Sequence, residues 1–332
     1  MDPLSQGVLG ASLPQAASQR QTIGCAGLFG FLAGMAPDLD VLIRSPDDPL
    51  LFLEYHRQFT HSLVFIPVGG LICGMLLYAL WGRGRGLSWQ RSWVFCTLGY
   101  GTHALLDTCT TYGTQLLWPF SNARIAWNNI SIIDPLFTLP LLTLVVLAAY
   151  RKQSKFARAG LAWALIYLSL GVVQRERAEA AGWELARQRQ HQPLRLEAKP
   201  SFANIILWKI VYQTDERYYV DAVRVWGDSK VYPGESVATL DVARDLPWLD
   251  PESQQALDIE RFRWFSNGYI AQDPAHQHRI IDVRYSMIPN QVDALWGIEL
   301  SPQAGRQQHV DYKTTRGRPN ERLGLFRSML FD

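Results

Sequence analysis

Cysteine is scarce in this sequence, and so is charge in its first half. The 332 residues include four cysteines and no CxxC spacing, which excludes a disulfide framework or a cysteine-based zinc cluster. The net charge of +2 gives no reason to expect nucleic-acid binding. No basic residues precede the first apolar stretch, so we expect no cleaved signal peptide.

The charged residues are distributed unevenly along the chain. Residues 1–174 contain 11 Lys/Arg and 8 Asp/Glu, whereas residues 175–332 contain 21 and 22. This contrast predicts an α-helical, polytopic membrane domain over residues 1–174. A charged helical stalk is expected over 175–190, and a smaller, polar, mainly β (α+β) domain over 191–332.

One apolar run is long enough to cross a bilayer by itself. Leu63–Gly82 has 20 residues and no charge, about 30 Å as a helix, which matches the hydrocarbon thickness. Further apolar runs bring the total to about five spans or buried helices: Gln21–Pro37, Ser92–Leu106, Ile132–Tyr150 and Ala159–Gln174. Residues 12–19, rich in Ala, Ser and Gln, are expected to form a surface helix or turn.

The second half changes to the pattern of strands. Four stretches rich in Val, Ile, Tyr and Trp, bounded by turn-forming residues, predict an antiparallel sheet: 202–212, 218–226, 279–288 and 292–300. Residues 252–265 are the best helix candidate in this half.

Basic residues in short loops predict how the chain is oriented. The loops 83–91 and 151–158 carry seven Lys/Arg and no acid. With five spans they lie on the same side, which the positive-inside rule makes cytoplasmic. Segments 37–62 and 108–131, together with the polar domain, are then expected on the extracytoplasmic side.

The histidines of the first half are concentrated in a few positions. All three, with four of the eight acids, fall in four clusters: Asp38 and Asp40; His56 and His61; His103 and Asp107; and Asp134. The predicted topology brings these clusters to one membrane face. An extended Asp-Leu-Asp would point Asp38 and Asp40 to the same side. His56 and His61 can share a site only if the helix breaks between them, because five helical residues would separate them by about 140°.

Imidazoles and carboxylates in this number suit a metal site. An ionisable side chain in a bilayer costs about 2.5–3.5 kcal/mol, so such groups pair, face a cavity or bind a ligand. The predicted ligands of one or two divalent ions, Zn²⁺ first and Mn²⁺ or Fe²⁺ next, are Asp38, Asp40, His56, His61, His103, Asp107 and Asp134. His61 and Asp107 are also the catalytic candidates. Arg57 and Arg124 are candidates for binding an anionic group of the substrate.

The predicted chemistry is hydrolysis by metal-activated water, acting on an ester or phosphoester of an amphiphilic or lipid-linked substrate met at the bilayer. Taken singly, His103 is compatible with a helix–helix hydrogen bond and Asp134 with a helix-start carboxylate. A transporter with an ion or proton relay, and a membrane-anchored interaction or regulatory protein, remain alternatives. Asp48 and Glu54 are interpreted as ordinary loop acids.

The order of these motifs resembles the YdjM-like family of bacterial inner-membrane proteins, predicted metal-dependent hydrolases. The matching stretches are Met1–Gln6, Leu9–Ala11, Gly34–Asp40, His56–Ser62, Gly99–Asp107, Tyr112–Thr114, Pro119–Ser121 and Ile130–Pro135. The resemblance implies a multi-pass inner-membrane protein with the His and Asp clusters as its metal site. Many members carry a histidine where this chain has Gln6, which implies one N-terminal ligand fewer here. The His/Asp-rich helical arrangement is also similar to that of zinc phospholipase C, an analogy that favours phosphoesters.

Overall fold

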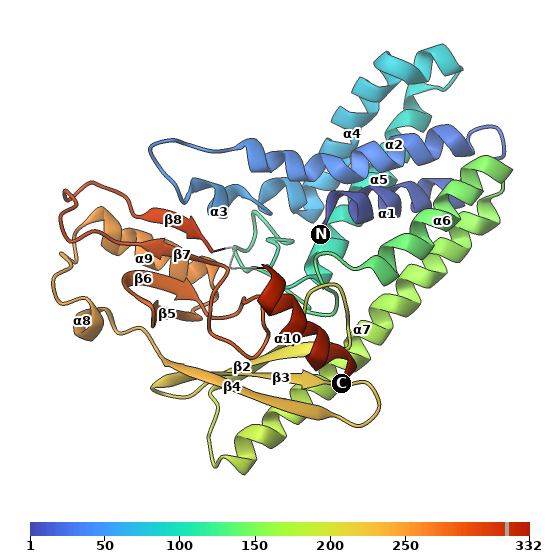
Figure 1. Cartoon of the computed structure of the whole chain (residues 1–332). Coiled ribbons are helices and arrows are strands. Elements are labelled where there is room, and N and C mark those ends of the chain that lie inside the picture. The colour runs from blue at the N-terminus through green and yellow to red at the C-terminus, as the bar shows by residue number, and fades with distance from the viewer. Residues whose placement is uncertain (316–318) are drawn as a thin grey trace. The chain divides into compact units, whose positions relative to one another are not determined.

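The computed structural model describes residues 1–315 and 319–332, with the side chains of 1–315 and 323–332. The chain divides into two compact units, which exchange short segments. The N-terminal unit comprises residues 1–43, 55–173 and 202–204, and the C-terminal unit comprises 44–54, 174–201 and 205–332. Figure 1 follows the chain from the blue and green helices of the first unit to the yellow, orange and red strands of the second.

The N-terminal unit is helical. Its elements are α1 (Pro3–Ala16), α2 (Ile23–Met35), η1 (Ala36–Leu42), η2 (Phe59–His61), η3 (Leu63–Phe65), α4 (Ile66–Leu77), η4 (Tyr78–Gly82), η5 (Arg83–Arg85), α5 (Trp89–Cys109), α6 (Pro135–Arg151) and the first part of α7 (Ser154–Gln188). Helix α7 continues without interruption into the predicted stalk and ends at Gln188.

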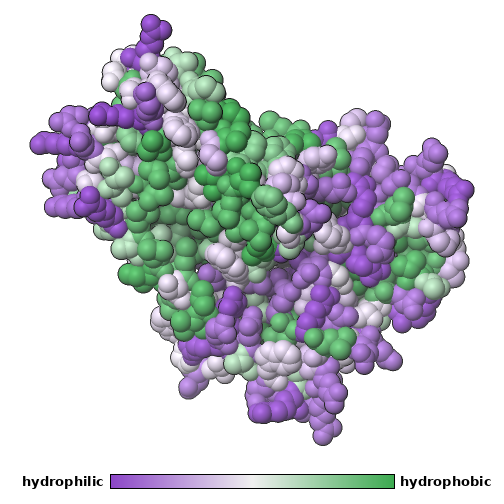
Figure 2. Space-filling model, turned by 180° about the vertical axis from the view of Figure 1, so that it is seen from behind, coloured by the Kyte–Doolittle hydropathy of each residue, from purple (hydrophilic) through white to green (hydrophobic). Residues whose placement is uncertain are grey.

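Three helical stretches are long and apolar enough to cross a membrane: Ile23–Leu42, Leu63–Arg85 and Ser154–Gln188. Helix α6 is a shorter apolar helix. Large apolar side chains such as Val68, Ile72 and Leu165 are exposed on these helices. Figure 2 shows a broad hydrophobic area, as expected for a surface that contacts lipid.

Helix α1 is the element that the sequence interpretation placed wrongly. Ser12 and Gln15 belong to this helix and are buried, although residues 12–19 were expected at the surface. The reason is close backbone packing: a Cβ atom on Gly10 would lie 2.6 Å from the carbonyl oxygen of Gly30. Glycine at this position lets α1 approach α2 and become an inner helix of the unit.

The C-terminal unit contains two four-stranded antiparallel sheets, each connected in simple order. The first is β1 (Arg195–Pro200), β2 (Leu207–Gln213), β3 (Arg217–Arg224) and β4 (Lys230–Ala238); the second is β5 (Ile270–Asp273), β6 (His276–Asp282), β7 (Trp296–Glu299) and β8 (Asp311–Thr314). Its helices are α3 (Leu51–Tyr55, the last residue of which belongs to the other unit), α8 (Val242–Asp245), α9 (Gln254–Phe265) and α10 (Pro319–Phe331).

Side chains from both sheets form one apolar core in this unit. Val211, Val220 and Tyr218 of the first sheet pack with Ala271 and Ile281 of the second. The predicted α+β class is therefore confirmed, and α9 coincides with the predicted helix. The strands β1, β4, β5 and β8 were missed. Polar residues interrupt their apolar pattern, as in the exposed stretch of β4.

Candidate metal centre

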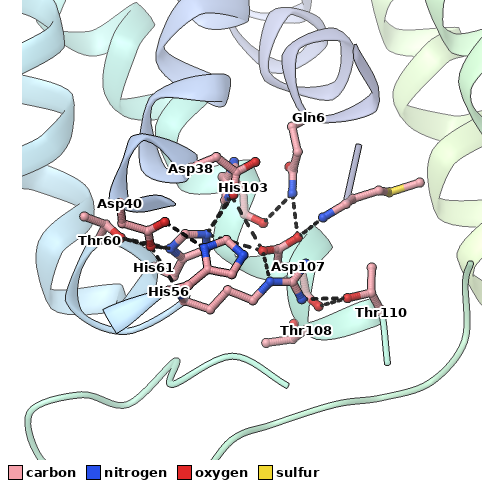
Figure 3. Close-up of polar contacts among 12 residues, drawn as sticks. Gln6, Asp38, Asp40, His56, Thr60, His61, His103, Asp107, Thr108 and Thr110 are labelled. Atoms are coloured by element: carbon pink, nitrogen blue, oxygen red, sulfur yellow. Dashed lines mark hydrogen bonds and ion pairs between the residues drawn. The ribbon is translucent and has the colours of Figure 1, made fainter. Parts of the chain in front are cut away.

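Six ionisable side chains of the N-terminal unit meet in one cluster, drawn in Figure 3: Asp38, Asp40, His56, His61, His103 and Asp107. The first two lie on η1, directly after α2. The next two lie after α3 and at the end of η2, and the last two lie one turn apart near the end of α5. Segments far apart in the sequence thus converge. The Asp-Leu-Asp segment is a 3-10 helix and not the expected extended chain.

Four of the six form an inner donor group: Asp38, His61, His103 and Asp107. The Nε2 atoms of His61 and His103 lie 2.9 Å apart, and Asp38 Oδ1 lies 3.4 Å from each of them. Asp107 Oδ2 lies 3.3 Å from His61 Nε2. Their ligand atoms all lie within 4.8 Å of one another. Imidazole nitrogens and carboxylate oxygens are donor types that proteins use for Zn²⁺.

Hydrogen bonds fix the other ring nitrogen of each inner histidine. His103 Nδ1 lies 2.6 Å from the carbonyl oxygen of Gly34, and His61 Nδ1 lies 3.2 Å from Asp40 Oδ2 and 2.9 Å from Thr60 Oγ1. Histidines that bind metals usually donate their second N–H to a carbonyl or carboxylate, which sets the tautomer. Both rings therefore present Nε2 to the inner donor group.

The carboxylate of Asp40 contacts four neighbouring residues. Its Oδ1 lies 2.7 Å from His56 Nδ1. Its Oδ2 accepts hydrogen bonds from the backbone N–H of Arg57 at 3.0 Å and from the Thr60 hydroxyl at 2.9 Å, besides its contact with His61. With both oxygens occupied, Asp40 is placed to orient the two imidazoles.

Asp38, Asp40 and His56 also form an outer donor group, which shares Asp38 with the inner one. The side chain of His56 is 33% exposed, whereas those of His61 and His103 are fully buried. The outer donor group is thus the accessible side of the cluster.

Asp107 lies among hydrogen-bond donors and cations in the interior. Its Oδ1 accepts a hydrogen bond from Gln6 Nε2 at 2.8 Å and pairs with the amino group of Met1. Its Oδ2 lies 3.1 Å from Arg57 Nε but is buried without a well-formed hydrogen bond among the described residues. Because such an oxygen costs about 1–3 kcal/mol when unsatisfied, it is a ready donor for a cation.

Arg57 occupies the break that the sequence required between His56 and His61. Its backbone φ is 66°, in the left-handed region, between α3 and η2. Its side chain is buried, ion-paired with Asp107 and hydrogen-bonded to Thr110 Oγ1 at 2.9 Å. Arg57 is thus a partner of Asp107, and its predicted contact with substrate stays a prediction.

The protonation of His61 is set by the carboxylates around it. Burial by itself lowers the pKa of an imidazole, but the close carboxylates of Asp107, Asp38 and Asp40 outweigh burial and raise the pKa of His61 to about 10. The protonated ring can then donate from Nε2 to His103 Nε2. A divalent cation bound at this point would replace that proton, because a histidine binds metal as the neutral ring.

Asp134 is the predicted ligand that joins neither donor group. Its Oδ1 caps the start of α6 by accepting from the backbone N–H groups of Leu136 and Phe137, and both carboxylate oxygens accept from the Tyr167 hydroxyl at 2.9 Å. These bonds satisfy the carboxylate locally, and the helix-start interpretation holds. The second substrate-binding candidate, Arg124, donates to the carbonyl oxygen of Gly113.

Sequence reasoning missed the residues that support the donors. Thr60 connects Asp40 to His61, and Gly34 fixes His103 through a backbone carbonyl, which no sequence pattern reveals. Gln6 donates to Asp107 from α1, and its position had been noted only through the family resemblance.

Part of the chain is similar to two curated proteins. It is 38% identical over 107 residues to the inner membrane protein YbcI of Escherichia coli (strain K12), covering 31% of this chain and 60% of that protein. It is 28% identical over 142 residues to the uncharacterized protein YfhP of Bacillus subtilis (strain 168), covering 41% of this chain and 42% of that one. The chain therefore spans less than two thirds of either relative. No solved structure matches it significantly.

The family described as YdjM inner membrane protein matches residues 1–178, the part that contains every residue of both donor groups. This match extends over more than half of the chain. The chain belongs to the YdjM inner membrane protein family.

Proposed function

We propose that this protein is a membrane-bound, metal-dependent hydrolase that holds one divalent cation, Zn²⁺ first, in the inner donor group. The observation that carries the proposal is the convergence of two imidazole nitrogens and two carboxylate oxygens in a buried site, with Asp107 Oδ2 left without a well-formed hydrogen bond. The outer donor group offers a place for a second cation.

A cation bound there supplies Lewis acidity and activates water at neutral pH. The residues of the cluster have three roles: they hold the cation, orient its ligands and exchange protons. His61, His103, Asp38 and Asp107 hold the cation. Asp40 and the carbonyl oxygen of Gly34 orient the imidazoles, and Arg57 neutralises Asp107. His56, held by Asp40 and partly exposed, is the residue of the cluster best placed to exchange a proton with a substrate.

We propose an amphiphilic ester or phosphoester as the substrate, because a site in a membrane unit meets lipid headgroups at high local concentration. Extracytoplasmic placement of the site is part of this proposal. Helix α5 begins beside the basic turn that contains η5 and ends at His103 and Asp107, so that turn and the cluster lie at opposite ends of the helix. If the basic turn is cytoplasmic, the cluster faces the other side.

The first experiment measures metal and activity on the same preparation. Wild-type protein purified in detergent is expected to carry about one or two equivalents of divalent metal by mass spectrometry. It is also expected to hydrolyse a member of a lipid and phosphodiester panel in a chelator-sensitive reaction. His103→Ala and Asp107→Asn should lose both properties, whereas His276→Ala, at an exposed position outside the cluster, should keep both.

Metal below about 0.2 equivalents in the wild type, unchanged in the two site variants, would defeat the metal site. If the protein bound metal but hydrolysed no member of the panel, the proposed hydrolase activity would be wrong. An ion or proton relay would then explain the cluster better.

A further inference from the structure

The segment 44–54 connects two residues of the cluster along the chain. Asp40 precedes it by four residues and His56 follows it by two. Although it interrupts the sequence of the N-terminal unit, this segment belongs to the C-terminal unit. The chain therefore connects each end of the segment to a residue of the candidate metal centre, Asp40 at one end and His56 at the other.

Within the C-terminal unit, Arg261 of α9 holds this segment with its whole guanidinium group. Its NH1 and NH2 donate to the two carboxylate oxygens of Asp48 at 3.0 and 2.7 Å, and its Nε donates to Glu54 Oε1 at 2.5 Å. A forked, charge-assisted pair of this kind fixes orientation as well as position. Asp48 and Glu54, interpreted from the sequence as ordinary loop acids, are thus specific partners of one arginine.

The arginine is itself fixed in place. Asp258, fully buried on the same helix, accepts a hydrogen bond from Arg261 NH1 at 2.9 Å. Its other oxygen lies 2.9 Å from His309 Nδ1 and accepts from the backbone N–H of Val310 at 3.1 Å. Asp258 therefore couples α9 to the start of β8.

Apolar contacts reinforce the same attachment. Phe52 meets Tyr312 of β8 edge to face, with ring centroids 5.1 Å apart. Leu50 and Leu53 are buried, with exposed fractions of 1% and 5%. The segment is thus anchored at Asp48, at Glu54 and through the apolar side chains between them.

We propose that the C-terminal unit controls the outer donor group through this anchored segment, with Arg261 as the positioning residue; this inference rests on the proposed function. The hydrogen bond between Asp40 and His56 closes the loop that contains the segment. Releasing the segment gives both ends conformational freedom, which disfavours that closure. The inner donors His61 and His103 have further partners outside the segment, the Thr60 hydroxyl and the carbonyl oxygen of Gly34.

The experiment uses the full-length protein in detergent and compares Arg261→Ala with Arg263→Ala. Arg263 lies on the same helix and pairs with the exposed Glu260, so it is a matched control. Two measurements are made: amide hydrogen exchange of peptides covering residues 40–58, and the rate at which diethyl pyrocarbonate modifies His56. Arg261→Ala is expected to raise both rates about tenfold, as a loss of local protection, while the cation of the inner donor group stays bound. Arg261→Lys, which keeps the charge without the fork, should restore part of the protection.

Unchanged exchange over residues 40–58 in Arg261→Ala would overturn the proposal. So would faster exchange throughout the C-terminal unit, which would make Arg261 a general stability residue. Loss of all bound metal in this variant would overturn the expectation that the inner donor group keeps its cation. A wild-type protein without metal would defeat the proposed function, yet the exchange measurement would still show whether Arg261 holds the segment.

Discussion

The Nε2 atoms of His61 and His103 lie 2.9 Å apart, although the two residues are 42 positions apart in the sequence. Two imidazole lone pairs repel each other at this distance unless a proton or a cation lies between them. The Nδ1 atom of each ring already has a partner, so the rings cannot turn away without losing a hydrogen bond. These hydrogen bonds therefore fix the positions of both Nε2 atoms in the candidate metal centre.

Asp40 and Asp107 are expected to differ when each is replaced by asparagine. Asp107→Asn removes an inner donor and should abolish stoichiometric metal binding. Asp40→Asn should lower metal affinity about 10- to 100-fold at unchanged stoichiometry, because it disturbs the orientation of His56 and His61. Metal titration after stripping with chelator measures both, with Asp47→Asn as an exposed control. If Asp40→Asn abolished binding, Asp40 would be a direct ligand.

Arg57→Ala is expected to destabilise the protein strongly. The substitution removes one of two cations that pair with the buried Asp107 carboxylate, the other being the Met1 amino group, and a buried ion pair that loses one member costs about 3–5 kcal/mol. The apparent melting temperature in detergent should fall well below that of Arg20→Ala, at an exposed position. Equal melting temperatures for the two variants would show that the ion pair contributes little. Adding Asp107→Asn to Arg57→Ala should recover part of the loss.

Gly99→Ala should separate α2 from α5. A Cβ atom at this position would lie 2.4 Å from the carbonyl oxygen of Gly30, so the backbones must move apart, at a cost of about 1–3 kcal/mol. Because His103 on α5 bonds to Gly34 on α2, metal affinity should fall together with thermal stability. Gly24→Ala, with nothing within 4 Å of its added Cβ, is the control and should be neutral or mildly stabilising. If Gly99→Ala kept the wild-type metal affinity, metal binding would not depend on the close packing of α2 against α5.

Lys209 predicts a pH dependence of stability in the C-terminal unit. Burial lowers the pKa of this lysine to about 7, although Asp282 and Glu235 partly offset the effect. Between this value and its usual pKa near 10.4 the unfolded chain binds more protons, so the free energy of unfolding rises with pH, by at most about 1.4 kcal/mol per pH unit. Melting curves from pH 7 to 9 should show this rise, and Lys209→Met should flatten it. An equal slope in both proteins would assign the dependence to other groups.

Sidedness can be tested by labelling single cysteines in a background without the four native ones. Cysteine at Asp47 or Ser229, both exposed, should react with a membrane-impermeant maleimide in intact cells, and cysteine at Gly84 in the basic turn should not. Asp47 is preferable to Asp48, which is paired with Arg261. The opposite labelling pattern would place the cluster in the cytoplasm.

The sequence by itself determined the class of the protein and most of the cluster. Apolar runs and charge distribution are local properties, and they were sufficient to predict a helical membrane part and a polar α+β part. The scarcity of His and Asp in the apolar half singled out His61, His103 and Asp107. An ionisable side chain in an apolar segment is costly unless it is paired, faces a cavity or binds a ligand.

Only the tertiary structure decided which of these residues meet. Asp134 and Asp107 have similar sequence settings, yet one caps α6 and bonds to Tyr167 while the other faces two imidazoles. Buried α1, the carbonyl oxygen of Gly34 and the pairing of Arg261 with segment 44–54 depend on backbone approach and on contacts between residues up to 213 positions apart. Periodicity reports which side of a helix is buried, but which partner covers that side is set by how all the helices and strands pack together.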